Sequence, residues 1–307
     1  MDKLSKFVSN PIVILVTYIL TFIGVILALS QNVILQIVSI GIMTLCIIIG
    51  TIFFIRFKCD VAKEKYKIKQ NVQKIYFNQA DAGIEKTMEL VQTMVNNSLS
   101  MKQTCFSEDH FKSVCKDICT SIRSILLNVC GIDFSVCIKQ IITNELVDCN
   151  YSKVSTQTIA RSGHKTIERS QNDSIPQQIS NNTSFKEILE NDRLLVWSSP
   201  NLKNTIACYK NLGKEYENPD KNYSNYYNST LVVPIRIRAK YISPIILKYT
   251  NNTKTYNCIA FLCADSPKEF DGNDEAFKLL ASKILRACGD ALYPLFENKL
   301  TKEIESI

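Results

Sequence analysis

Cysteine and histidine are the residues from which a thiol-based or metal-based active site would be built. The chain has 12 cysteines but only two histidines, His110 and His164. A helix would place Cys115 and Cys119 on one face, yet no Cys-x-x-Cys supplies the remaining ligands of a zinc site. A Cys–His or Ser–His dyad would need the fold to join distant groups. The sequence therefore predicts no catalytic residue and no metal site.

Aromatic and basic side chains provide the candidates for ligand binding. Trp197 is the only tryptophan and ends an apolar stretch, where it either lines a pocket or packs in the core. Tyr226 and Tyr227 stand in a polar, tyrosine-rich segment that either closes over a ligand or remains solvated. Arg236 and Arg238 alternate with isoleucines and share one face of a strand, toward either an anion or solvent. We take these five residues as candidates for an unknown small-molecule ligand, and no cofactor is identified.

The cysteines suit either a secreted disulfide framework or a reduced protein interior. Cys115 and Cys119 share an apolar helical stripe, whereas Cys137, Cys258 and Cys263 stand within strand-like runs. Free cysteine behaves as a small buried hydrophobe, and a reducing compartment tolerates that use. These positions favour reduced core cysteines.

Charge and motif content exclude several function classes. The net charge is +7, and the basic residues are spread evenly after residue 80. This charge is too small and too dispersed for a nucleic-acid-binding surface, so no nucleic-acid partner is predicted. No phosphate-binding loop, kinase motif or cyclase signature is present.

Two uncharged segments dominate the first part of the chain. Residues 11–55 contain no Asp, Glu, Lys or Arg. Within them, residues 11–30 and 33–55 are each apolar over about 20 positions, the length that spans a bilayer core of ~30 Å. A signal peptide is disfavoured because no cleavage site and no polar stretch follow the first segment. The sequence predicts a transmembrane α-hairpin with helices at these two segments.

Basic residues on both flanks of the hairpin predict its orientation. Lys3 and Lys6 precede the first segment, and a lysine-rich stretch follows the second. Positive residues stay on the cytoplasmic side of a membrane. We therefore expect a multi-pass protein of the cell membrane, with residues 1–10 and the C-terminus cytoplasmic and the lipid bilayer as a partner.

A helical stalk is expected over residues 56–100. Apolar residues follow coiled-coil spacing in two stretches that differ in phase. The first stretch contains Ile68, Val72, Ile75 and Ala82, and the second contains Ile84, Met88, Val91 and Val95. The pattern is compatible with a homodimer through residues 61–95 or with a monomeric stalk that packs on its own domain.

The remaining sequence predicts one domain over residues 101–298, followed by a tail at 299–307. Ser107 is expected to begin a helix that Gly131 ends. Ser184 is expected to cap a short helix, and Pro294 to kink or shorten the last one. Expected strands lie at 134–139, 154–160, 194–197, 231–237 and 256–265, polar loops at 162–183 and 214–228, and the last helix at 274–298. This order predicts an α+β fold, one sheet with helices against it.

Three stretches of this domain resemble GAF domains, a family of small-molecule-binding and regulatory modules. They are Asn128–Val136, the Ser229–Ile235 strand with its Val-Pro-Ile, and Cys258–Ser266 followed by Phe270-x-x-x-Asp274-Glu275. The resemblance covers roughly residues 105–297 and implies a GAF-like antiparallel sheet with flanking helices. Members that bind cyclic nucleotides carry an Asn-Lys pair before the Phe-x-x-x-Asp-Glu element. That pair is missing here, which speaks against such a ligand.

Three functions remain open from the sequence. The first is a membrane-anchored cytoplasmic sensory or regulatory protein whose GAF-like domain binds a small molecule or a protein partner. The second is a membrane effector whose transmembrane hairpins assemble when a signal binds. The third is a thiol-dependent reductase, because some GAF-type enzymes reduce methionine sulfoxide with cysteines. The lack of catalytic motifs favours a protein that is not an enzyme.

Overall fold

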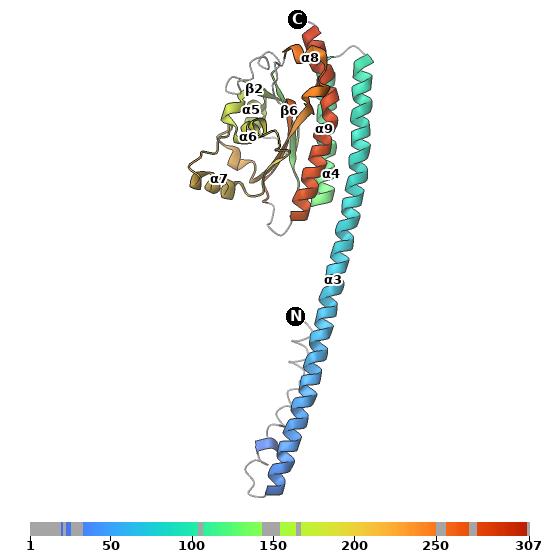
Figure 1. Ribbon diagram of the computed structural model, residues 1–307, viewed down its shortest axis with the longest axis vertical. Coiled ribbons are helices and arrows are strands. Elements are labelled where there is room, and N and C mark those ends of the chain that lie inside the picture. Colours follow the sequence, from blue (N-terminus) through green and yellow to red (C-terminus); the bar gives the residue numbers. More distant parts are fainter. Residues whose placement is uncertain are drawn as a thin grey trace. The chain divides into compact units, whose positions relative to one another are not determined.

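The computed structural model divides the chain into two compact units, Met1–Ile75 and Tyr76–Ile307, which are described separately. The residues that it describes are 20, 23–25, 33–103, 107–142, 154–163, 167–249, 256–269 and 275–305. The first unit contains most of a long helix, and the second contains a sheet with its helices (Figure 1). All the candidate ligand-binding residues belong to the second unit.

The long helix is α3, Val33–Gln103, which is 71 residues long. It includes the predicted second transmembrane segment and the predicted stalk in one continuous helix. The first predicted segment, residues 11–30, lies outside the described residues except for positions 20 and 23–25.

The structure corrects the expectation of a membrane protein. A span needs about 20 consecutive apolar residues in one helix. Within the described ranges, no helix is both long enough and apolar enough to meet that requirement. This finding contradicts the predicted multi-pass location in the cell membrane and leaves the transmembrane hairpin unsupported. The membrane-effector function, which depends on that hairpin, is not retained.

The second unit is built on one antiparallel sheet of six strands. The strand order is β3-β2-β1-β6-β5-β4, so β1 and β6 lie in its middle and the two longest strands, β5 and β6, lie beside each other. The strands are β1 (Ser135–Ile141), β2 (Ser155–Ser162), β3 (Gln177–Gln178), β4 (Trp197–Ser199), β5 (Ser229–Arg238) and β6 (Tyr256–Ser266). The α+β class, with one antiparallel sheet and packed helices, is confirmed.

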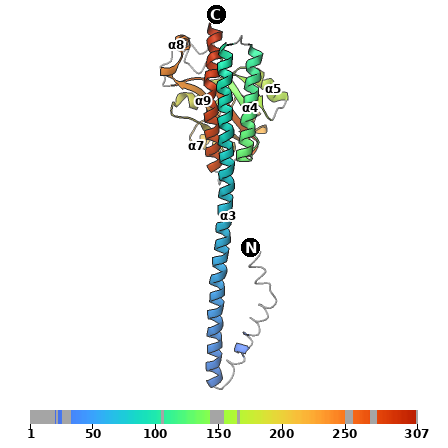
Figure 2. The same cartoon turned by 90° about the vertical axis from the view of Figure 1, so that its right-hand side faces the viewer.

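Different helices cover the two faces of the sheet, which we call the helix face and the loop face. Figures 1 and 2 show α4 and α9 beside the end of α3 on the helix face, with α5, α6 and α7 on the other side of the sheet. The helices are α4 (Glu108–Cys130), α5 (Ile167–Ser174), α6 (Thr183–Glu190), α7 (Leu202–Asn211), α8 (Pro244–Tyr249) and α9 (Glu275–Glu305). The short 3-10 turns are η2 (Ile179–Asn181), η3 (Tyr223–Asn225) and η4 (Ala239–Tyr241).

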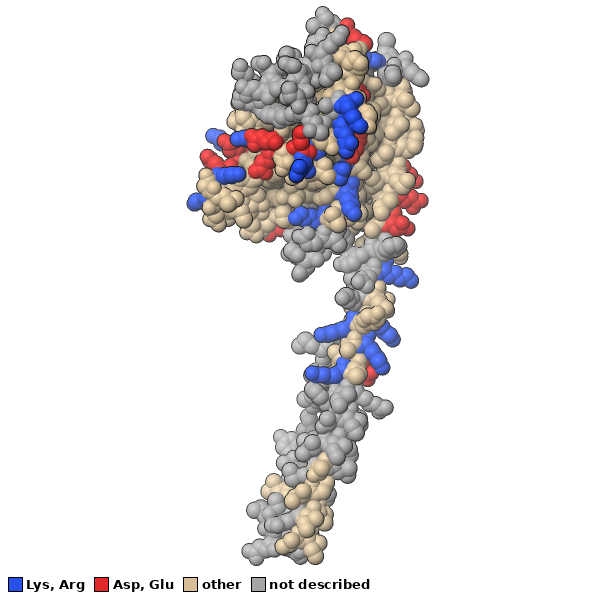
Figure 3. Space-filling model, in the orientation of Figure 1, with Lys and Arg blue, Asp and Glu red and all other residues tan. Residues whose placement is uncertain are grey.

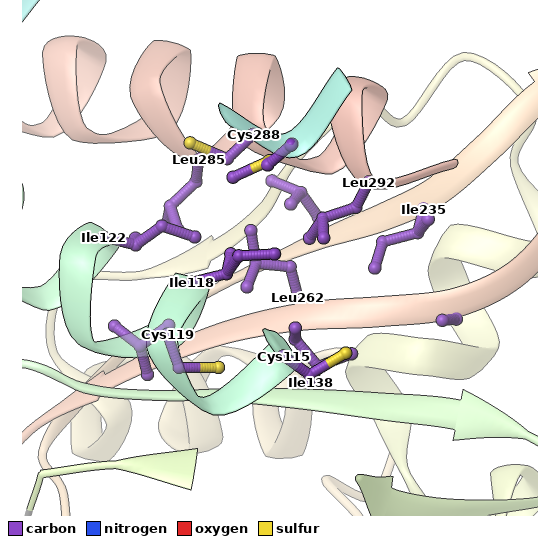
Figure 4. Close-up of a cluster of buried hydrophobic side chains, with 14 of the residues drawn as sticks. Cys115, Ile118, Cys119, Ile122, Ile138, Ile235, Leu262, Leu285, Cys288 and Leu292 are labelled. Atoms are coloured by element: carbon purple, nitrogen blue, oxygen red, sulfur yellow. The ribbon is translucent and has the colours of Figure 1, made fainter. Parts of the chain in front are cut away.

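The helix face holds a core of aliphatic and aromatic side chains and thiols. Figure 4 shows Cys115, Cys119 and Cys288 among isoleucines and leucines of α4, α9 and the strands. The end of α3 joins this core through Leu90 and Met94. A Cβ at Gly83 would overlap Val129 of α4, so only glycine allows the two helices to approach this closely.

Strand alternation sends the intervening residues to the loop face. Val136 and Ile138 of β1 point into the helix-face core, whereas Cys137 belongs to a second buried cluster. That cluster also contains Phe185 of α6 and Trp197 of β4. The sheet therefore separates two cores of different composition.

Several local features differ from the sequence-based expectations. Asn182, not Ser184, caps α6, because its side chain accepts a hydrogen bond from the Phe185 amide. Helix α9 passes through Pro294 and continues to Glu305, beyond the predicted end. The expected loop at 162–183 contains α5 and β3. The predicted start and end of α4 are confirmed, with Ser107 as its cap and Gly131 in the left-handed conformation.

Candidate ligand-binding site

A polar cavity lies on the loop face, and we call it the loop-face cavity. The inner sides of β1, β2, β5 and β6 form its floor, and residues 172–185 and 216–227 surround it. Its volume is about 50 Å³. A water molecule needs roughly 10–15 Å³ of such space, whereas drug-sized ligands occupy pockets of about 300–1,000 Å³. In this conformation the cavity therefore admits only a very small molecule.

The register of β1 and β6 determines which side chains reach this floor. Ser135 pairs with Asp265, Cys137 with Cys263, and Lys139 with Phe261. Cys137, Lys139, Cys263 and Asp265 all line the cavity. The same alternation that sends Val136 to the helix face thus places two thiols, an amine and a carboxylate beside one another.

A buried ion pair forms one wall of the cavity. Arg161 of β2 donates two hydrogen bonds of 2.7 Å to the carboxylate of Asp173. The side chains are 5% and 16% exposed, and a second carboxylate, Asp265, lies 3.9 Å from Arg161. Burial alone would raise the pKa of Asp173, but the hydrogen bonds and charge of Arg161 outweigh it and lower that pKa. The pair therefore stays ionised at neutral pH.

The two thiols of the floor are coupled to each other and to this pair. A hydrogen bond from Cys263 lowers the pKa of Cys137, and the nearby positive charge of Arg161 acts in the same direction. The pKa of Cys263 is raised, first because of that hydrogen bond and then by burial. One thiol of the pair thus ionises more readily than an ordinary cysteine, although both are buried.

Aromatic side chains of residues 209–227 cover the cavity. Tyr216 contacts Trp197 and Tyr223, with ring centroids 6.2 and 5.8 Å apart. Tyr227 accepts a 2.6 Å hydrogen bond from Asn218, and both residues line the cavity. The predicted polar loop at 214–228 is therefore held in place by aromatic contacts and side-chain hydrogen bonds.

This covering segment is also attached to α6. Glu217 donates its amide to the Thr183 side chain and accepts a hydrogen bond from the Thr183 amide, at 2.7 and 3.1 Å. The Glu187 carboxylate accepts hydrogen bonds from Trp197 and Tyr209. Burial and the bond to Glu187 raise the pKa of Tyr209 to about 12. Access for a larger ligand requires these contacts to rearrange.

The structure separates the five candidate residues. Tyr227 lines the loop-face cavity, whereas Trp197 is 5% exposed and packs in the core behind it. Tyr226 is partly buried and is not among the residues that line the cavity. Arg236 and Arg238 line a different cavity, beside α9. The candidates therefore do not form one site.

Sequence reasoning missed the charged residues of the loop-face cavity. Arg161 lies in β2, just beyond the predicted strand at 154–160, and Asp173 lies in α5, where a loop was predicted. Nothing in the sequence indicated that these two residues would meet. Cys137 was interpreted only as a core residue, and Cys263 was considered for thiol chemistry together with Cys258, not with Cys137. The alternation of β1 was the available signal, because it separates Cys137 from Val136 and Ile138. Within the described part of the chain, no three His, Cys, Asp or Glu residues are arranged to hold a metal.

No family model matches the sequence, and no curated protein matches it. Among solved structures, the chain is similar to the GAF domain of an Acinetobacter phosphoenolpyruvate-protein phosphotransferase, at 11% identity and a TM-score of 0.37, over 72% of this chain and 95% of that one. It is also similar to a type II free methionine-R-sulfoxide reductase from Thermoplasma acidophilum, at 14% identity and a TM-score of 0.37, over 64% and 94%. A third is the phycoerythrobilin-bound GAF domain of a cyanobacterial phytochrome, at 12% identity and a TM-score of 0.36, over 68% and 94%.

Proposed function

We propose that residues 76–307 form a GAF-like regulatory domain that binds a small molecule in the loop-face cavity. The buried Arg161–Asp173 pair in the wall of that cavity is the observation that carries the proposal. Taking two charges out of water is costly, and apolar residues of similar volume usually serve stability as well or better. Buried charges of this kind concentrate at binding and catalytic sites.

The cavity's lining favours a compact polar ligand. Lys139 and Arg161 offer positive charge and hydrogen-bond donors, while Asp220 and Asp265 offer acceptors. Several of these groups bond to one another here; Thr230, for example, donates to Asp265 at 2.8 Å. A bound ligand would replace these internal hydrogen bonds with hydrogen bonds to its own polar groups. Molecules with both acidic and basic groups, such as amino acids, match this lining best, and the contacts of residues 209–227 must rearrange to admit them.

A thermal-unfolding screen of the full chain tests this proposal. A panel of amino acids, nucleosides and small dicarboxylates is added to the wild type, Lys139→Met and Lys186→Met. Lys139 lines the cavity, whereas Lys186 is exposed on α6 and serves as the matched control. A ligand present at 100 times its Kd stabilises the native state by about 2.7 kcal/mol. We expect one class to stabilise the wild type and the control but not Lys139→Met. A panel without effect, or an equal effect on all three proteins, contradicts the proposal.

The thiol pair favours a second candidate function, reduction of a small sulfoxide. Directly opposed residues on antiparallel strands lie within the Cα spacing that a disulfide needs. The sulfoxide oxygen would leave as water with two protons and two electrons from Cys137 and Cys263, which become a disulfide. Methionine sulfoxide mixed with the reduced chain is the test. The expected products are one methionine and one Cys137–Cys263 disulfide per chain, and no product from Cys137→Ser. Product formation without the disulfide contradicts this role.

We also propose that α3 pairs with a second copy of the chain. In the second unit it presents Ile84, Met88 and Val95, which are 49%, 69% and 39% exposed, while Leu90 and Met94 pack on its own domain. Coiled-coil partners bury such a stripe. Sedimentation of the wild type and of Ile84→Glu/Met88→Glu tests this pairing. We expect a dimer that the double substitution dissociates, and a wild-type monomer contradicts it.

A further inference from the structure

Three buried polar atoms without a hydrogen bond of good geometry gather beside α9. Within the part of the chain that the structure describes, the buried side-chain atoms lacking such a bond are Arg236 Nη2, Asn257 Nδ2 and Tyr293 Oη, and the last two lie close enough to interact with each other. Arg236 and Tyr293 line one cavity, and Asn257 stands next to it, paired with Ile237 in the β5–β6 ladder. Buried polar groups are nearly always satisfied, so a cluster of exceptions marks a missing partner.

The cavity that Arg236 and Tyr293 share has the size of a ligand site, and we call it the β5–α9 cavity. Its volume is about 370 Å³, within the roughly 300–1,000 Å³ of small-molecule pockets. Strand β4 pairs only with Thr230, Leu231 and Val232 of β5. Among the described residues, no strand pairs with the rest of that side of β5, and Pro234, Arg236 and Arg238 from this part of the strand line the cavity. The ladder shifts register between Ile235 and Arg236, a bulge of the kind that re-aims the next side chain.

Arg236 carries a buried charge that makes no direct ion pair among the described residues, although the carboxylate of Asp290 acts on it at longer range. Its exposed fraction is 9%. Its guanidinium lies 4.2 Å from the ring centre of Tyr256, and a cation–π contact offsets only a small part of the cost of burying a charge. The one acidic residue of the cavity lining, Asp290, instead forms a 3.9 Å ion pair with Arg286. Arg236 thus keeps a donor without an acceptor.

The other residues that line the β5–α9 cavity are of two kinds, basic and apolar or aromatic. Arg238 and Arg286 are exposed and add positive charge, so three arginines face one aspartate. The walls are apolar or aromatic, with Pro234, Tyr241 and Pro294 among them. Figure 3 shows basic side chains gathered along α9 on one face of this unit. A ligand that matches both kinds of residue has an anionic group on an apolar body.

We propose that the β5–α9 cavity binds a small organic anion, a carboxylate or phosphate monoester on an apolar or aromatic body. The oxyanion accepts hydrogen bonds from Arg236 Nη2 and Tyr293 Oη, and Asn257 provides a third donor nearby. Arg238 and Arg286 attract the anion to the cavity, and the proline and tyrosine side chains contact its body. This cavity shares no lining residue with the loop-face cavity, so the proposal is independent of the ligand proposed there.

Calorimetric titration of the full chain tests the proposal with four probes: benzoate, phenyl phosphate, inorganic phosphate and benzyl alcohol. We expect saturable binding of benzoate or phenyl phosphate. Inorganic phosphate lacks the apolar body and benzyl alcohol lacks the charge, so each should bind at least about tenfold more weakly. If neither aromatic anion binds, or if benzyl alcohol binds equally well, the proposal is wrong.

Three substitutions locate the binding. Arg236→Met should abolish binding of the aromatic anions and leave the unliganded protein at least as resistant to heat, because it removes an unpaired buried charge. Arg286→Gln should weaken binding several-fold, whereas Lys283→Gln, exposed on the same helix, should not change it. Lys139→Met in the loop-face cavity should also bind normally.

The same variants identify a wrong proposal even if Arg236→Met fails to fold. Unchanged affinity in Arg286→Gln together with Arg238→Gln contradicts a site at this cavity. A wild-type dimer that Arg236→Met converts to a monomer shows that a second copy, not a small anion, fills the cavity. That outcome also overturns the proposal.

Discussion

The two faces of the sheet use the same residue type in opposite ways. On the helix face, burial raises the pKa of Cys288 to about 12 and that of Cys119 well above its ordinary value. On the loop face, Cys137 is equally buried but lies beside a second thiol and the charge of Arg161, and its pKa is lowered. Burial alone makes a thiol inert. A buried thiol gains chemistry only where the fold also supplies a charge.

The ion pairs of the second unit show the same contrast. Arg123–Asp133 and Arg161–Asp173 have the same two-bond geometry, with all four distances 2.7 Å. The first pair is 34% and 36% exposed, whereas the second is 5% and 16% exposed. The two-bond geometry is matched, but the second pair is buried and has Asp265 as a further carboxylate near Arg161. The two pairs therefore contrast a surface contact with a charged site held inside the protein.

The largest expected effect comes from removing one partner of the buried pair. Arg161→Met leaves Asp173 and Asp265 buried without their cation, which should destabilise the protein by about 3–5 kcal/mol. Arg123→Met is the matched control, and an exposed pair is worth only about 0–1 kcal/mol. Urea unfolding of the two variants measures both values. Equal losses would show that burial does not distinguish these pairs.

The second prediction concerns how tightly the helix face is packed. Gly83→Ala places a methyl group against Val129, and overpacking of this kind costs about 1–3 kcal/mol. Gly41 lies on the same helix with nothing near its Cβ position. Gly41→Ala should therefore be neutral or stabilise the helix by about 0.5–1 kcal/mol. Thermal unfolding compares the two, and a harmless Gly83→Ala would mean that α3 does not pack on α4 as described.

The sequence predicted the helix face far better than the loop face. Its elements have strong periodic patterns, as in α4 from its Ser107 cap to Gly131. The loop-face cavity depends on Arg161 and Asp173, which are 12 residues apart in the sequence. They come into contact because α5, which contains Asp173, returns the chain to β2. No local pattern encodes that contact. The expectation that Pro294 would shorten the last helix was wrong for a related reason, because the packing of α9 on the sheet outweighs the local preference to end a helix there.

Acid should weaken the native state through Asp173 of the loop face. The native pKa of Asp173 is lowered, so its pair contributes stability above the unfolded value of about 3.9 and loses it as the pH falls through the native pKa. Asp173→Asn removes that titration. We expect the unfolding free energy of the wild type to fall more steeply below about pH 4 than that of the variant. Parallel pH profiles would contradict an ionised, paired Asp173.

The smallest effect is the difference in thiol reactivity that the two faces imply. A lowered pKa means that Cys137 carries more thiolate at neutral pH than an ordinary cysteine, whereas Cys119 and Cys288 remain protonated. Brief iodoacetamide treatment at pH 7 and 8.5, followed by peptide mass spectrometry, measures each site. Exposed Cys59 and Cys208 report reagent access. We expect Cys137 to be labelled before the helix-face thiols at both pH values. Faster labelling of Cys288 than of Cys137 would reverse the comparison, because the helix-face core would then be the more open and more reactive of the two.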